Sequence, residues 1–150
     1  MMAVKDQLQQ ECKQFLNSRL LAITDRIASI QDSLQSETKS SAGDKHETGR
    51  AMLQLEREKA GNQLKALQNQ QMLLSKVDCN VQSDVVCLGS LVTTNIAKYF
   101  IAISVGKIAI DGHIYLAISP SSPIGRLLLG KSVDDEFVFN GVKQQIIEIR

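Results

Sequence analysis

Apolar residues in the first half of the chain recur at alternating spacings of three and four, which is the heptad pattern of helices packed along a seam. The first run consists of Leu16, Leu20, Ile23, Ile27, Ile30 and Leu34, and Leu8 and Cys12 extend it backward. A weaker run consists of Leu53, Ala60, Leu64, Leu67 and Leu74. Strong helix formers dominate here, so the pattern predicts two helices of about 30 residues joined as an antiparallel hairpin.

After Asp78 the apolar pattern changes to a period of two, or to continuous runs rich in Val, Ile, Phe and Tyr. Such runs are typical of strands. Asp111–Gly112 and Asn140–Gly141 stand between them, and both dipeptides are strong signals for two-residue hairpin turns. The second half is therefore expected to form a small antiparallel sheet.

One stretch of the second half, "SPSSPIGRLLLGK", contains both prolines of the chain. Ser122 is placed to cap a short helix, with Pro123 at its first position and Gly130 at its end. The three leucines at 127–129 are expected in the core. The predicted fold class is α+β: a coiled-coil hairpin over 1–77, with its tip near 37–47, followed by a small sheet domain with one short helix over 78–150.

Composition and charge narrow the function classes. The chain has 150 residues and a net charge of +1, with 4% aromatic residues and no Trp. The charge argues against a nucleic-acid or membrane binder driven by electrostatics alone. The scarcity of aromatic residues argues against a base-stacking platform.

The three cysteines, Cys12, Cys79 and Cys87, form no Cys-x-x-Cys motif and no cluster with histidine. This pattern predicts free thiols in a reducing compartment, buried as small apolar residues. The beginning of the chain lacks the apolar segment of a secretory signal. No apolar run approaches the roughly 20 residues needed to cross a bilayer, so we expect a cytoplasmic protein.

Candidate chemistry is concentrated in "SSAGDKHETGR", between the two predicted helices. Asp44 and Glu47 are three residues apart, so on one helix face they can share a divalent cation. The same spacing also fits a helix N-terminus at which Asp44 caps and Glu47 completes a capping-box-like pair. "HETGR" holds Arg50 where a zinc-protease motif needs a second histidine, so His46 is not expected to bind zinc.

The segment "ISPSSPIGRLLLGKSVDDEFVF", followed by "QQIIEI", resembles the C-terminal domain of the bacterial Gre transcript cleavage factors (GreA/GreB). The matching positions are Ser119, Ser122, Pro123, Ile124, Leu128, Gly130, Lys131, Asp135 and Glu136. In that family a strand leads into a Ser-Pro turn, a short helix ending in Gly-Lys, an acidic turn and two strands. The resemblance implies an FKBP-like α+β domain.

The first half resembles the coiled coil of the same family, whose tip holds Asp-x-x-Glu. Here the matching stretch is "GDKHETGRA", in which Gly43, Asp44 and Glu47 align. The distance onward to Val77 fits the family's second helix almost without gaps, so the resemblance covers nearly the whole chain.

The resemblance implies a specific role. The globular domain docks on RNA polymerase at the mouth of its secondary channel, and the docking segment holds Ser122, Pro123, Ile124, Gly130 and Lys131. The coiled coil enters the channel, where Asp44 and Glu47 help to hold Mg²⁺ at the polymerase active centre as backtracked RNA is hydrolysed. The protein would then be a monomer that binds no cofactor by itself and no membrane, and that assists an enzyme without being one.

The tip departs from the family pattern. Lys45 and His46 stand between the two acids, and Thr48, Gly49 and Arg50 replace Asn-Ala-Glu. The cations Lys45 and Arg50, with His46, are expected to contact the partner, and either to weaken cation capture or to turn the tip toward RNA phosphate or polymerase acids. The alternative function is a non-cleaving regulator of initiation or pausing that occupies the same channel.

Two functions from other classes also fit the predicted fold. A peptidyl-prolyl isomerase or chaperone needs an aromatic-lined pocket. The available aromatics are Tyr99, Phe100, Tyr115, Phe137 and Phe139, which fall on predicted strands where core packing is expected. A coiled-coil scaffold is the remaining possibility.

Overall fold

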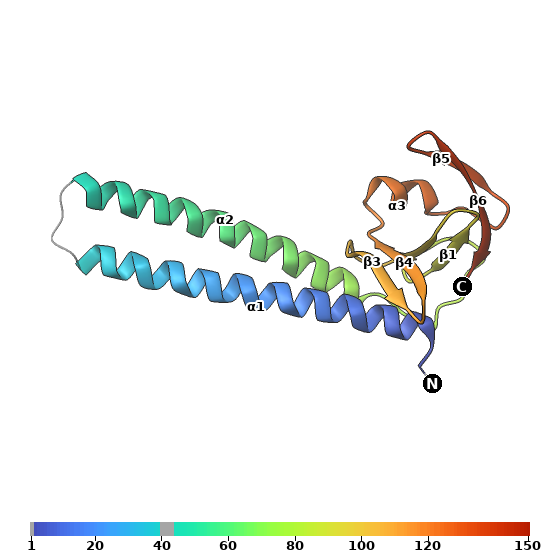
Figure 1. Cartoon of the computed structure of the whole chain (residues 1–150), viewed down its shortest axis with the longest axis horizontal. Helices are drawn as coiled ribbons and strands as arrows, with labels where there is room; N and C mark the ends of the chain where they lie inside the picture. Colours follow the sequence, from blue (N-terminus) through green and yellow to red (C-terminus); the bar gives the residue numbers. More distant parts are fainter. Residues whose placement is uncertain (1, 40–43) are drawn as a thin grey trace. The chain divides into compact units, whose positions relative to one another are not determined.

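A computed structural model describes residues 2–39 and 44–150, apart from the side chains of residues 38–39 and 44–47. The predicted helical hairpin is present. Helix α1 (Val4–Lys39) and helix α2 (Asp44–Ser75) have 36 and 32 residues and run antiparallel, side by side (Figure 1). No helix in the described ranges has a stretch long and apolar enough to cross a membrane.

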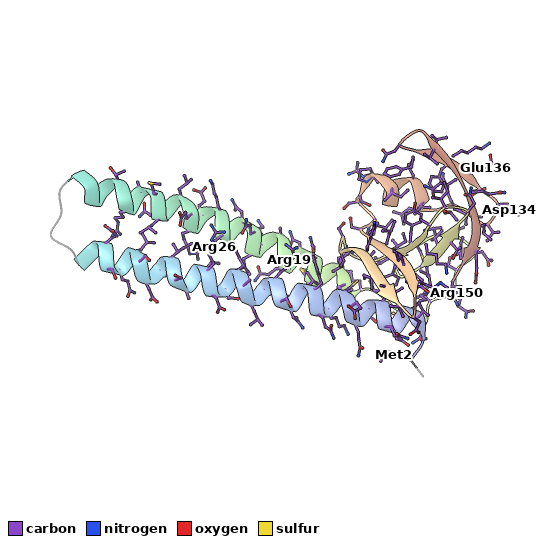
Figure 2. The ribbon with its side chains drawn as sticks, viewed as in Figure 1. Met2, Arg19, Arg26, Asp134, Glu136 and Arg150 are labelled. Carbon is purple, nitrogen blue, oxygen red and sulfur yellow. The ribbon has the colours of Figure 1, made fainter. Side chains whose placement is uncertain are left out.

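The predicted heptad seam holds the two helices together. Buried Ile23, Ile27, Ile30 and Ala60 form its core, and half-buried Leu34, Leu64 and Leu67 pack against them. The fully buried Ala60 carries only a methyl group, which lets the larger isoleucines of α1 fill the space between the helices. Arg19 and Arg26 lie on α1 beside this seam (Figure 2).

Six strands form one sheet in the order β3-β4-β2-β1-β6-β5. The strands are β1 (Leu91–Thr94), β2 (Lys98–Ile101), β3 (Gly106–Ile110), β4 (His113–Ile118), β5 (Glu136–Phe139) and β6 (Val142–Ile149). All neighbours are antiparallel except β2 and β4, which are parallel. The prediction of an α+β fold is confirmed. The prediction of a wholly antiparallel sheet is wrong, because the β3–β4 hairpin packs with β4 next to β2 and running in the same direction.

Both predicted hairpin turns are confirmed. Asp111 and Gly112 have φ of 50° and 80°, and Asn140 and Gly141 have φ of 51° and 77°. Two consecutive residues with positive φ define the type I′ turn, whose twist matches that of the flanking strands. These turns join β3 to β4 and β5 to β6.

Helix α3 (Pro123–Leu128) packs on the sheet through Ile124 and Leu128. The cluster of buried residues consists of Val86, Val92, Tyr99, Ile101, Ile124, Leu128, Phe137 and Ile146. These residues come from the segment before β1, from four strands and from α3. The core of the sheet domain therefore fixes the position of α3, which carries the predicted docking segment.

A polar network lies inside the sheet around Gln144. Gln144 is 4% exposed, and its Oε1 accepts hydrogen bonds from Tyr99 Oη at 3.0 Å and from Thr94 Oγ1 at 2.8 Å. Thr94 Oγ1 also accepts the backbone N–H groups of Ile96 and Ala97. The network joins β6 to β1, β2 and the turn between them.

Replacing Gln144 with Ala is expected to lower the free energy of unfolding by about 1–3 kcal/mol, because the buried Tyr99 hydroxyl loses its acceptor. Urea denaturation followed by tyrosine fluorescence measures this change, since both tyrosines lie in the sheet. Lys143→Ala is the matched control on the same strand. Its salt bridge to Glu136 is exposed, so its effect should be under about 1 kcal/mol. Equal losses in the two variants would contradict the role of the network.

The chain divides into two compact units, one of Met1–Phe15 with Met72–Arg150 and the other of Leu16–Gln71. Hydrogen bonds join the start of α1 to the segment between α2 and β1, which belongs to the same unit as the sheet. Lys5 Nζ donates to the Val81 carbonyl at 3.3 Å, and Gln9 Nε2 donates to the Val77 carbonyl at 3.3 Å. The sequence boundary at 77/78 stays a prediction, since these units cut through both helices.

Candidate functional site

The acidic pair at the predicted tip stands at the beginning of α2. The helix begins at Asp44, so positions 44 and 47 are i and i+3 in its first turn, the spacing of neighbours on one helix face. The side chains of Asp44, Lys45, His46 and Glu47 lie outside the described residues. Their capping, metal-binding and partner contacts remain predictions.

A third acid near this end of the hairpin is missing from the sequence prediction. A Cβ built on Gly49 would lie 3.6 Å from the carboxylate atoms of Glu37, so the Glu37 carboxylate lies beside the second turn of α2. Glu37 is half-buried, as are Gly49 and Arg50, while Thr48 is exposed. The helical register contained the signal, because Glu37 follows seam residue Leu34 by three positions and shares its face.

The predicted docking helix α3 begins as its sequence predicts. Ser122 is the N-cap, and its Oγ accepts a hydrogen bond from the Gly125 N–H at 3.1 Å. The same hydroxyl donates to the Ser119 carbonyl at 2.7 Å. Pro123 occupies the first helical turn, where a missing N–H costs nothing. Ser122 thus links the helix to the turn before it.

Gly125 lets the start of α3 approach that turn closely. A Cβ at this position would overlap the Ser119 carbonyl oxygen and lie 2.9 Å from Ser122 Oγ. Contacts shorter than about 3 Å are not tolerated without movement, and here a backbone oxygen is the obstacle. Only glycine therefore fits this position without displacing the turn.

The five predicted docking residues differ in exposure. Pro123 and Gly130 are exposed, and Ser122 and Lys131 are half-buried. Ile124 is 7% exposed and belongs to the core, so it positions α3 from beneath. The exposed residues of this segment are the ones available to a partner.

Leu129 is exposed, contrary to the expectation from the sequence. Leu128 is fully buried and Leu127 packs partly buried against the core, but Leu129 is 39% exposed. The expectation that all three leucines are core residues is wrong for Leu129. It stands after the last helical residue with extended backbone, at ψ 131°, and the turn of the chain directs it away from the sheet. An exposed leucine therefore accompanies Pro123 and Gly130.

The end of α3 is tied to the segment before β1. Gly130 N donates to the Val86 carbonyl at 2.9 Å, and Val86 N donates to the Lys131 carbonyl at 2.8 Å. Gly130 has φ of 81°, a conformation that suits glycine. Gly130 thus ends the helix, as predicted, and the two hydrogen bonds hold Lys131 in place.

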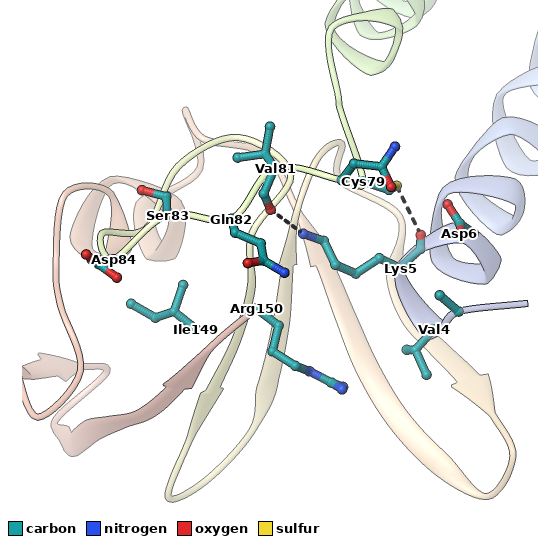
Figure 3. A pocket seen from close by; sticks show the side chains of 12 residues that line it. Val4, Lys5, Asp6, Cys79, Val81, Gln82, Ser83, Asp84, Ile149 and Arg150 are labelled. Atoms are coloured by element: carbon teal, nitrogen blue, oxygen red, sulfur yellow. Dashed lines mark hydrogen bonds between the residues drawn. The ribbon is translucent and has the colours of Figure 1, made fainter.

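A cavity of about 720 Å³ lies between the beginning of α1 and residues 79–84 (Figure 3). Lys5 extends across it to the Val81 carbonyl. Burial lowers the pKa of Lys5, and the charge of Arg150 acts in the same direction. Cys79 Sγ lies 3.0 Å from Gln9 Oε1 and 3.4 Å from the Lys5 carbonyl. These contacts join α1 to the segment after α2, which sequence patterns did not predict.

All three cysteines are free thiols, as predicted. Cys12 is fully buried on the helix seam, and burial raises its pKa to about 12. Cys79 and Cys87 are half-buried, so the expectation that all three are buried is wrong for these two. Burial also raises the pKa of Cys79, which leaves a weakly nucleophilic thiol.

The aromatic residues pack as structural residues. Tyr99, Phe100, Tyr115 and Phe137 are buried, and Phe139 packs partly buried against the core. Lys98 Nζ lies 5.5 Å from the ring centroid of Tyr115, a cation–π distance. Buried rings leave little aromatic surface for a substrate, so this arrangement does not favour the isomerase alternative.

The chain was compared with family models, curated proteins and solved structures. No family model matches it, and no curated protein matches it. Among solved structures, that of the transcription factor Gfh1 matches 91% of this chain and 91% of its own chain, with 20% sequence identity and a TM-score of 0.36. The function proposed below rests on the residues of this chain.

Proposed function

We propose that this protein is a Gre-like transcription factor that binds RNA polymerase at the secondary channel. In this proposal the sheet domain docks on the polymerase, and the hairpin tip assists cleavage of backtracked RNA. The protein has no catalytic activity of its own and acts as a monomer in the cytoplasm. We also propose that the sheet domain is FKBP-like.

The observation that carries the proposal is the position of the acidic pair. Asp44 and Glu47 stand in the first turn of a 32-residue helix, at the turn of a hairpin that pairs along a heptad seam. In this proposal the hairpin carries the groups at its turn into the secondary channel of the polymerase. The Gre resemblance assigns metal positioning to these two acids.

Carboxylate oxygens suit Mg²⁺, which is usually bound by one or two carboxylates together with water and substrate oxygens. Two acids make an incomplete site by themselves, which fits a cation shared with the polymerase. When bound, Mg²⁺ would supply charge stabilisation and an activated water. Asp44 and Glu47 would orient that cation, and the remaining ligands would come from the polymerase and solvent.

The docking segment gives independent support. The run from Ser119 to Phe139 folds into the capped helix α3 and the following strand β5, the elements that the Gre motif implies. Its exposed residues, Pro123, Leu129 and Gly130, lie beside half-buried Lys131. The side chain of Ile124 supports this surface from the core.

A second function, regulation of the polymerase without cleavage, is favoured by the charges at the tip. Lys45 follows Asp44 directly in the sequence, and Arg50 follows Glu47 by three residues. Positive charge near a carboxylate competes with a metal cation for that carboxylate. In this case the protein would occupy the channel and change initiation or pausing.

Sedimentation of the purified protein with bacterial RNA polymerase tests the docking step. We expect a complex with the wild type and weaker binding by Lys131→Glu, because the substitution reverses a charge in the docking segment. Lys107→Glu on β3 is the matched control and should bind like the wild type. Absence of a complex with the wild type would contradict both proposed functions.

A further inference from the structure

The cavity of about 720 Å³ at the beginning of α1 is lined by charged side chains of both signs. Lys5 and Arg150 are its cations, and Asp6 and Asp84 are its acids. All residues that line the cavity belong to the compact unit that contains the sheet. The cavity is therefore built within a single unit.

The cations and acids of the cavity do not neutralise one another. Lys5 Nζ donates one hydrogen bond, to the Val81 carbonyl at 3.3 Å, and forms no ion pair with a described residue. Arg150 pairs through Nε with Glu148 at 3.5 Å, in an exposed contact. Asp84 has neither a hydrogen bond nor an ion pair with any side chain that the structure describes. Charges of both signs are thus left available to a ligand.

The acids lie on opposite sides of the cations. Lys5, Gln82 and Arg150 lie in the middle of Figure 3, with Asp84 on one side and Asp6 on the other. Asp6 stands in the first turn of α1, where an acid interacts favourably with the end of the helix. Asp84 has no comparable structural role. A ligand that matches this arrangement carries its anionic group near Lys5 and Arg150 and a cationic group near Asp84.

The electrostatics of Lys5 favour an anion at this point. Burial lowers the pKa of Lys5 and the charge of Arg150 acts in the same direction, whereas Cys79, Cys87 and Asp78 act to raise it. A ligand carboxylate beside Lys5 and Arg150 would stabilise the charged amine and offset the repulsion between the two cations. The site gains most from a ligand that brings this negative charge.

We propose that the cavity binds a short peptide by its two charged ends, with the carboxylate at Lys5 and Arg150 and the ammonium group at Asp84. Its volume falls in the range of about 300–1,000 Å³ found for sites that enclose drug-sized ligands, which a single free amino acid would fill only in part. The side-chain amides of Asn80 and Gln82 also line the cavity and can bond to peptide groups. This inference does not depend on polymerase binding or transcript cleavage.

The same cavity is poorly suited to a nucleotide. Its two acids balance its two cations, so a polyanionic phosphate chain gains no net attraction. None of the described residues that line it is aromatic, so a base would find no stacking partner. A ligand with both charges fits this lining better than one with negative charge alone.

Titration of the ¹⁵N-labelled full-length protein with trialanine tests the proposal. We expect the backbone amide signals of residues 79–84 and 149–150 to shift at millimolar peptide. N-acetyl-trialanine lacks the ammonium group and trialanine amide lacks the carboxylate, so each should bind at least about tenfold more weakly. L-alanine carries both charges but makes fewer contacts, and should also bind more weakly than trialanine.

The Lys5 amine gives a second readout. Its pKa, followed by ¹³C NMR of the side chain, should rise when trialanine binds, because the ligand carboxylate stabilises the charged form. Trialanine amide, which lacks that carboxylate, should leave the pKa of Lys5 unchanged. A merely steric effect of the peptide on the cavity would not distinguish the two probes.

Variants of the protein assign the two ends of the peptide. Asp84→Asn should bind trialanine and N-acetyl-trialanine equally, because the ammonium group has lost its partner. Arg150→Gln should reduce the preference for trialanine over its amide. Asp25→Asn removes an exposed charge of α1 outside the cavity and should keep both preferences. Gln82→Trp keeps every charge but fills the cavity, and should abolish binding. Circular dichroism confirms that each variant keeps its fold.

Four results would overturn the proposal. The first is no shift of the signals of residues 79–84 with trialanine, and the second is equal affinity of the wild type for trialanine and its N-acetyl form. The third is unchanged binding by Gln82→Trp. The fourth is tighter binding of L-alanine or inorganic phosphate than of trialanine, which would assign the cavity to a free amino acid or to an anion. None of these measurements involves the polymerase, so this inference and the proposed function fail separately.

Discussion

Asp44→Asn and Glu47→Gln are each expected to reduce stimulation of RNA cleavage by roughly 10- to 100-fold, because each removes a charged ligand of a cation shared with the polymerase. Binding to the polymerase should be unchanged, since the docking residues lie in a different compact unit. The measurement is the rate at which the 3′ end of the RNA is removed in a stalled, backtracked polymerase complex.

Asp32→Asn is the matched control for these variants. It removes the same kind of charge from an exposed position on α1 and should leave cleavage unchanged. Cleavage at the wild-type rate with Asp44→Asn would exclude Asp44 from the chemistry. Glu37→Gln is a useful third variant, because the Glu37 carboxylate lies near the same end of the hairpin.

Gly125→Ala is expected to lower the free energy of unfolding of the sheet domain by about 2–4 kcal/mol. The added methyl group overlaps the Ser119 carbonyl oxygen, and overpacking against backbone is relieved only by moving the turn away from α3. The higher helix propensity of Ala offsets only about 1 kcal/mol of this cost. Tyrosine fluorescence during urea denaturation reports the change, and polymerase binding should weaken together with it.

The same Gly-to-Ala substitution at position 61 is expected to have the opposite effect on the free energy of unfolding. Gly61 lies within α2, and an added Cβ would meet only Arg57 Nη1, at 3.0 Å. That atom is the end of a flexible side chain and can move aside. Gly61→Ala should therefore stabilise the hairpin by up to about 1 kcal/mol, measured by circular dichroism. Destabilisation of similar size in both variants would refute the close approach at Gly125.

Local patterns were enough to predict much of this fold. The alternation of three and four from Leu16 to Leu34 fixed the seam of α1, because apolar burial dominates helix pairing. Asp111–Gly112 and Asn140–Gly141 predicted their turns, since few other residues adopt positive φ at two consecutive positions. The Ser122-Pro123 pair predicted the beginning of α3 for similarly local reasons.

Features that depend on distant contacts were not predictable in this way. The parallel pairing of β2 with β4 depends on how a hairpin packs against another strand, and no residue of "KYFI" encodes it. The bond from Lys5 to the Val81 carbonyl joins positions 76 residues apart. Leu129 fitted an apolar run but is exposed, because the chain direction changes at the end of α3. By contrast, the place of Asp44 and Glu47 in the first turn of α2 was predictable, because their spacing is typical of a helix N-terminus.

The central claim is that this hairpin delivers two carboxylates to the active centre of RNA polymerase. The most direct test adds the purified protein to a backtracked complex with 3′-labelled RNA and Mg²⁺, and follows the release of short labelled products. We predict that the wild type releases them faster than the polymerase alone, and that Asp44→Asn does not. A wild-type protein that binds the polymerase yet leaves the RNA intact would contradict the claim and favour regulation without cleavage.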